Sequence, residues 1–167
     1  LKRPPQFCIK LNTEGRVTQT RAYGDGLLRD SNSCLLFAFH KEFGDIDVWG
    51  AESLALLHGL WLCTGLVTES LLVEVDSESL RLLQAGGVSK WPLCNTLRNI
   101  SGLLVSLSAS ISHVVREVNS AADNLTGLRL ASELFCTSHT QLSGQIRASI
   151  GLDSREFSFP RCRSVRG

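Results

Sequence analysis

The chain has 167 residues, of which 43% are hydrophobic, enough for one domain with its own core. Its 17 Lys and Arg nearly balance 16 Asp and Glu, so no overall charge indicates a polyanionic partner. No apolar run approaches the roughly 18 residues of a membrane span, and the six cysteines lack the close spacing of a zinc site. We therefore expect an intracellular protein without a membrane partner, whose cysteines are thiols; nucleus, cytoplasm and organelle stay equally open.

The N-terminal third predicts three successive strands. Paired prolines make residues 1–6 a linker end. Residues 7–12 alternate apolar and polar side chains, and a turn at residues 13–15 would leave Glu14 at the strand end. Residues 23–28 and 33–41 follow as two further strands, separated by a turn at residues 29–32, so these three strands should pair antiparallel.

In the middle of the chain, the spacing of apolar residues changes from that of a strand to that of a helix. Apolar residues at helical spacing predict a helix over residues 48–64, with Glu52 in its first turn or two. The apolar run of residues 70–76 ends in an acid, which is typical of a buried strand that carries Asp76 at its carboxyl end. Two helices should follow, over residues 77–85 and 93–107.

The last part predicts a fifth strand over residues 111–117 and, after Asn119, a helix to about Ser138 with Asp123 near its start. We place the folded domain at residues 7–140 and a basic tail at residues 141–167. Three antiparallel strands followed by two strands entered through helical crossovers give an α/β fold with a mixed five-stranded sheet flanked by helices.

Four acids occupy distinct places in this order: a strand end, a helix start, a second strand end and a second helix start. Carboxylate oxygens are the ligands of hard divalent cations, and two such ions about 3.5–4 Å apart can support phosphodiester hydrolysis. The acids are Glu14, Glu52, Asp76 and Asp123.

The sequence around these acids resembles the plant ribonuclease H-like family over about residues 5–166. The resemblance rests on Leu-Asn-Thr-Glu-Gly at 11–15, Ala-Glu-Ser-Leu-Ala-Leu at 51–56, Val-Glu-Val-Asp-Ser at 73–77 and the stretch 113–125. It implies a ribonuclease H fold, Mg²⁺ or alternatively Mn²⁺ held by Glu14, Glu52, Asp76 and Asp123, and cleavage of the RNA strand of RNA/DNA hybrids by a monomeric domain.

The sequence departs from known ribonucleases H in two ways, and these departures support an alternative function. The family usually has Asp where this chain has Glu14, and the extra methylene displaces the carboxylate although Mg²⁺ demands near-ideal octahedral geometry. The histidine that bacterial and animal ribonucleases H use for product release also has no counterpart. The alternative is a catalytically degenerate domain that binds nucleic acid or a protein partner. A third hypothesis is that the chain is a segment of a longer retroelement polyprotein.

A hybrid would be bound through basic side chains on the same domain, because phosphate contacts provide most of the affinity for nucleic acid. The candidates for these contacts are Arg16, Arg21, Lys90, Arg98 and Arg116.

Overall fold

The computed structural model of the chain describes residues 6–19, 21–66, 70–75, 93–113, 133–142 and 144. Three strands follow one another at the N-terminal end: β1 (Cys8–Thr18), β2 (Arg21–Arg29) and β3 (Leu35–Gly44). Both pairings, β1 with β2 and β2 with β3, are antiparallel, as the sequence predicts.

The helices and the parallel strands follow. Helix α1 (Val48–Cys63) leads to β4 (Ser70–Val75), and helix α3 (Leu93–Ser106) leads to β5 (Ser110–His113). Strand β4 pairs parallel to β1, and β5 pairs parallel to β4. The predicted combination of three antiparallel strands and two parallel additions is therefore confirmed.

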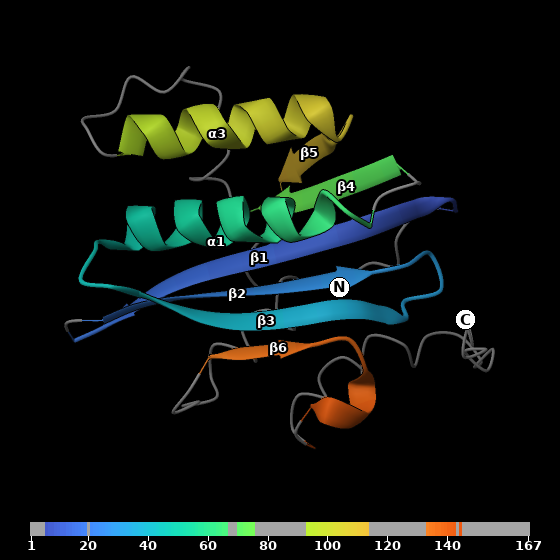
Figure 1. Cartoon of the computed structure of the whole chain (residues 1–167), viewed down its shortest axis with the longest axis horizontal. Helices are drawn as coiled ribbons and strands as arrows, with labels where there is room; N and C mark the ends of the chain where they lie inside the picture. Colours follow the sequence, from blue (N-terminus) through green and yellow to red (C-terminus); the bar gives the residue numbers. More distant parts are fainter. Residues whose placement is uncertain are drawn as a thin grey trace.

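The prediction of five strands is wrong, because a sixth, β6 (Leu134–Cys136), pairs antiparallel with β3. The sheet order is β5-β4-β1-β2-β3-β6 (Figure 1). The sequence predicts a helix up to about Ser138, but residues 134–136 occupy the edge of the sheet instead. Their backbone groups satisfy the open edge of β3, which outweighs the weak helical pattern of so short a segment.

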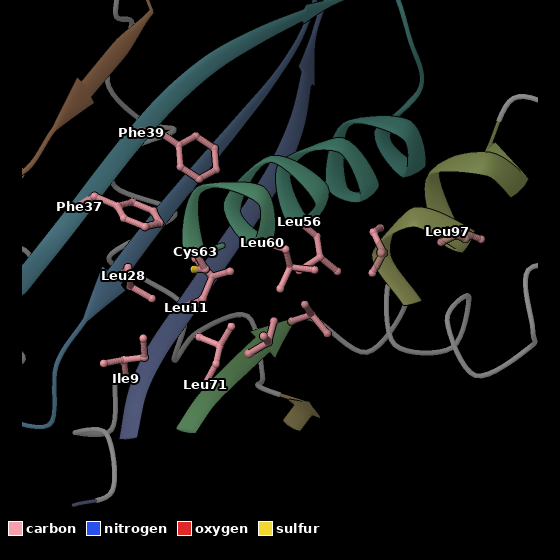
Figure 2. Packing of buried hydrophobic residues seen from close by; sticks show 13 residues of the cluster. Ile9, Leu11, Leu28, Phe37, Phe39, Leu56, Leu60, Cys63, Leu71 and Leu97 are labelled. Carbon is pink, nitrogen blue, oxygen red and sulfur yellow. The ribbon is translucent and has the colours of Figure 1, made fainter. Parts of the chain in front are cut away.

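Helices α1 and α3 lie together on one face of the sheet (Figure 1). The main core lies between the sheet and these helices, as Figure 2 shows, with Leu11 and Leu71 from the sheet and Leu56 and Leu60 from α1. Leu97 and Ile100 of α3 join the same cluster. Neither α1 nor α3 is long and apolar enough to cross a bilayer.

The two ends of β2 are fixed by identifiable local features. Gln19, with φ 53°, lies between β1 and β2, and Ser33, with φ 64°, lies between β2 and β3. In the second turn the Asp30 carboxylate accepts hydrogen bonds from the backbone N–H of Asn32 at 2.9 Å and of Cys34 at 2.7 Å. The predicted turn is therefore confirmed, and it sets the register between β2 and β3.

Of the six cysteines, Cys8, Cys63, Cys94 and Cys136 are free thiols, as expected. Cys34 is disulfide-bonded, so the expectation of thiols throughout is wrong for this residue. Burial raises the pKa of the Cys63 thiol to about 12. Cys63 therefore acts as a small apolar core residue.

Candidate active site

Glu14 lies inside β1 and not at its end, so the predicted turn at residues 13–15 is wrong. The strand continues to Thr18, with Glu14 opposite Asp25 and Gly15 opposite Gly24 on β2. Gly15 is required here for close packing and not for a turn: a Cβ at this position would come within 2.2 Å of the backbone nitrogen of Glu52. The glycine thus brings the start of α1 against the middle of β1.

Glu52 is positioned by the way α1 begins. The Asp47 carboxylate accepts a hydrogen bond of 2.8 Å from the backbone N–H of Gly50, which caps the helix N-terminus. Glu52 then falls in the second turn, half-buried, with its backbone beside Gly15. The structure therefore brings the backbones of two of the four predicted acids, Glu14 and Glu52, to the same part of β1.

This part of β1 lies where the parallel pairing with β4 ends. The last residue pair of that ladder is Asn12 with Glu74, whereas β1 continues for six residues beyond Asn12 along β2. Within the described residues, no strand lies on the β4 side of Glu14. The other two predicted acids, Asp76 and Asp123, lie outside the described residues, as do Lys90 and Arg116.

The sheet face opposite α1 and α3 carries an unusual set of buried polar side chains. Alternation along β1 puts Leu11 and Gly15 towards α1 and Lys10, Asn12 and Glu14 on the other face. Each member of the set is at most 9% exposed. The members are Lys10, Asn12, Glu14, Asp25, Arg29, His40 and Glu74.

At one end of this set, the Glu74 carboxylate is bound by a lysine and by an asparagine amide. Lys10 Nζ donates to Glu74 Oε1 at 2.6 Å, and Asn12 Nδ2 donates to Glu74 Oε2 at 2.9 Å. Arg29 Nη2 donates to Asn12 Oδ1 at 3.4 Å. These bonds join β4, β1 and β2 immediately before Glu14, so they fix the relative positions of the three strands at the site.

At the other end, His40 Nδ1 lies 2.8 Å from Asp25 Oδ1. Burial raises the pKa of the Asp25 carboxyl, while the hydrogen bond and charge of His40 and the charge of Arg16 oppose that rise. The sequence reasoning missed this pair. The available signal was Asp25 within the largely apolar stretch 23–28 and His40 directly after the apolar stretch 35–39, because a turn centred near residues 32 and 33 folds these two positions against each other.

The described basic candidates occupy two different places. Arg16 is half-buried two residues beyond Glu14, with its guanidinium 5.5 Å from the centroid of the Tyr23 ring, and Arg21 is exposed and ion-paired with Glu42. Arg98 instead lines an apolar groove of about 630 Å³ between α1 and α3, whose lining includes none of the four predicted acids. Of the three candidates that the structure describes, Arg16 and Arg21 lie at the glutamate end of β1 and Arg98 does not.

Within the part of the chain that the structure describes, no three His, Cys, Asp or Glu side chains are arranged to hold a metal ion. On the polar face, Glu14 and Asp25 are cross-strand partners, so two described carboxylates stand at neighbouring positions of the sheet. A complete metal site would therefore need ligands beyond the described residues.

Comparison with known proteins places the fold. The family described as reverse transcriptase-like matches residues 12–127, which is more than half of the chain, so the chain belongs to this family. The structure and its similarities define a ribonuclease H-like domain. No curated protein matches the chain.

Three solved structures illustrate the likeness. The ribonuclease H1 of the halophilic archaeon Halobacterium salinarum has a TM-score of 0.62 and 19% identity, covering 70% of this chain and 92% of its own. A compost-derived ribonuclease H1, solved with an RNA/DNA hybrid, has a TM-score of 0.60 and 24% identity, and the match covers 70% of this chain and 92% of the compost-derived one. The prototype foamy virus protease-reverse transcriptase has a TM-score of 0.57 and 15% identity, covering 92% of this chain and 22% of its own. At these identities the likeness establishes the fold.

Proposed function

We propose that the chain is a divalent-metal-dependent endonuclease that hydrolyses the RNA strand of RNA/DNA hybrids. The observation that carries the proposal is the placement of Glu14: a buried carboxylate on the central strand, next to the start of α1, at the point where the β1–β4 ladder ends. Ribonuclease H1 structures share this fold, and one of them was solved with a hybrid.

The register supports including Asp76 in the same site. Asn12 faces Glu74 across the parallel ladder, and the same register extended by two residues on each strand would set position 76 opposite position 14. Asp76 follows β4 directly in the sequence, so the proposal needs only that this spacing continue. Asp123 is assigned on the resemblance to the family alone.

The donor set fits a hard divalent cation. Glu14, Glu52, Asp76 and Asp123 would hold Mg²⁺, with Mn²⁺ as the alternative, because all four offer carboxylate oxygens. When bound, such an ion activates a water and stabilises the charge that develops on the phosphate. Burial of Glu14 keeps bulk water from its carboxylate, and the Lys10, Asn12 and Glu74 bonds hold the strand that presents it.

Hybrid binding is assigned to Arg16, Arg21, Lys90, Arg98 and Arg116. Arg16 and Arg21 have the most direct geometric support, because both lie on the β1–β2 hairpin beyond Glu14. Their guanidinium groups would contact phosphates of a hybrid seated over the glutamate end of β1.

The experiment is a Mg²⁺ titration of cleavage of a labelled RNA/DNA duplex, with Asp76→Asn and Glu14→Gln as matched variants. We expect metal-dependent cleavage of the RNA strand by the wild-type protein and a loss of about 100-fold or more in either variant. No cleavage by well-folded wild-type protein, or equal cleavage by Asp76→Asn, would contradict the proposal.

A second candidate function is a catalytically degenerate domain that binds nucleic acid or a protein partner. Glu14 favours it, because the longer side chain shifts the carboxylate by about one bond length where a metal site tolerates little error. Activity that appears only after Glu14→Asp would support degeneration, whereas activity in wild type would exclude it.

The chain is also proposed to be a domain of a longer retroelement protein. The foamy virus likeness, which covers 22% of the viral chain, is consistent with this arrangement. An upstream reverse transcriptase in the flanking coding sequence would support it. The boundaries at residues 7–140, the basic tail at 141–167 and the monomeric state remain predictions.

A further inference from the structure

The carboxylate of Asp25 is buried one strand away from Glu14 and is held in a fixed orientation. Asp25 is 0% exposed, and its Oδ1 lies 2.8 Å from Nδ1 of His40, which is itself 2% exposed. The His40 ring is stacked on the ring of Tyr23 with centroids 5.4 Å apart. Because His40 is fixed in this way, the Asp25 carboxylate has little freedom to turn.

Asp25 and Glu14 are direct cross-strand partners in the antiparallel β1–β2 ladder. Such partners project from the same face of a sheet with their Cβ atoms about 4.5–5.5 Å apart. Two carboxyl groups therefore occupy neighbouring positions in a site where both residues are at least 95% buried. Burying two carboxylates side by side is unfavourable, and cationic groups nearby reduce that cost. The charges of His40 and Arg16 act on Asp25 in this way, and a bound cation would act on both carboxylates.

The second oxygen of Asp25 supplies an independent observation. Oδ2 is buried and has no hydrogen-bond partner among the described residues, whereas Oδ1 is occupied by His40. Buried polar atoms without a partner are rare in native proteins, and an unplaced ion is one of their recognised explanations. The lone pairs of Oδ2 are thus available to a cation on the face that carries Glu14.

We propose that Asp25 is a further carboxylate ligand of a divalent cation bound at Glu14, with His40 as the residue that orients it. Mg²⁺ is commonly held by one or two protein carboxylates together with water and substrate phosphate oxygens, so Glu14 and Asp25 would supply two of its ligands and the others would come from outside the described residues. A histidine hydrogen-bonded to a ligating carboxylate is the expected supporting contact. The identity of the cation rests on the proposed nuclease function, but its binding does not depend on catalysis.

The first measurement is the affinity of the purified protein for Mn²⁺ by isothermal titration calorimetry. We expect Asp25→Asn to weaken binding at least about 10-fold, while Asn still accepts the hydrogen bond from His40. The control is Asp45→Asn, which removes an exposed carboxylate outside the site and should leave the affinity unchanged. Equal affinity in wild type and a folded Asp25→Asn variant would overturn the proposal.

The second measurement separates a ligand from a merely structural residue. In Asp25→Cys, Cd²⁺ should produce a thiolate-to-metal absorption band beyond that of the wild-type cysteines, because sulfur would replace a ligating oxygen. The absence of an additional absorption band would overturn the proposal. This test can still be made if Asp25→Asn fails to fold. Wild type that binds Mn²⁺ without cleaving hybrid contradicts the nuclease function alone, and wild type that binds no divalent cation contradicts both.

Discussion

Gly15 and Glu52 touch through their backbones: a Cβ on Gly15 would lie 2.2 Å from the nitrogen of Glu52 and 2.5 Å from its Cα. The atoms in the way belong to the main chain of α1, so no side-chain rotation can make room. The distance between β1 and the start of α1 is therefore set by the absence of a side chain at position 15.

We predict that Gly15→Ala destabilises the fold by about 1–3 kcal/mol, because the added methyl group must push α1 away from β1. Urea denaturation monitored by circular dichroism measures this loss. The control is Gly102→Ala on α3, where a Cβ meets no atom within 4 Å. It should be neutral or stabilise the helix by up to about 1 kcal/mol. Equal stability of the two variants would refute the close-packing explanation.

The buried Lys10–Glu74 ion pair should be strongly coupled. Replacing Lys10 by Met leaves the Glu74 carboxylate buried without its charged partner, which is expected to cost about 3–5 kcal/mol. The double variant Lys10→Met/Glu74→Leu should lose much less than the two single variants together. A double-mutant cycle in urea gives the coupling energy, and simple additivity would show that the pair does not act as a unit.

His58 should make stability depend on pH. Burial, and secondarily the charge of Lys41, lowers its pKa below 6.5, so the folded protein binds a proton less readily than the unfolded chain. The contribution of neutral His58 to the stability of the fold is fully present above pH 6.5. It is lost as the pH falls from 6.5 through the lowered pKa of the folded state. In thermal melts between pH 5 and 8, the Tm of His58→Gln should therefore fall less than that of wild type on acidification. A parallel pH dependence in both proteins would contradict this.

Cys63 should resist alkylation in the folded protein. It is fully buried in the core and the pKa of its thiol is about 12, so almost no thiolate is present at pH 8. Mass spectrometry of peptides after brief iodoacetamide treatment should find Cys63 unmodified, with Cys8 and Cys94 labelled faster because both are partly exposed. Labelling of Cys63 at their rate without denaturant would mean that the core opens readily.

The sequence was sufficient to predict α1, α3 and β4 because their signals are local. Helix α1 begins at the predicted residue and ends one residue early. Strand β4 begins at the predicted residue, and the last position of its predicted range, residue 76, lies outside the described residues. The end of β1 was wrong because Gly15 suggests a turn, whereas its actual role depends on α1, more than 30 residues away in the sequence.

The candidate site was predictable only where its residues stand in recognisable local patterns. Glu14 and Glu52 were predicted in this way, and their role stays a prediction. Asp25 and His40 were missed because their importance arises from a cross-strand register, which composition and periodicity do not reveal. Strand β6 was missed because three residues are too few to display an alternating pattern.

Strand β1 has neighbours of opposite kinds, with β2 antiparallel on one side and β4 parallel on the other. During synthesis β2 follows after a short turn, whereas the last residue of β4 is Val75, more than 50 residues beyond Thr18. The hairpin can therefore form while the other edge of β1 still presents unpaired amides and carbonyls. Closing that edge requires a long-range step with a larger entropic cost, so the parallel ladder should limit the folding rate.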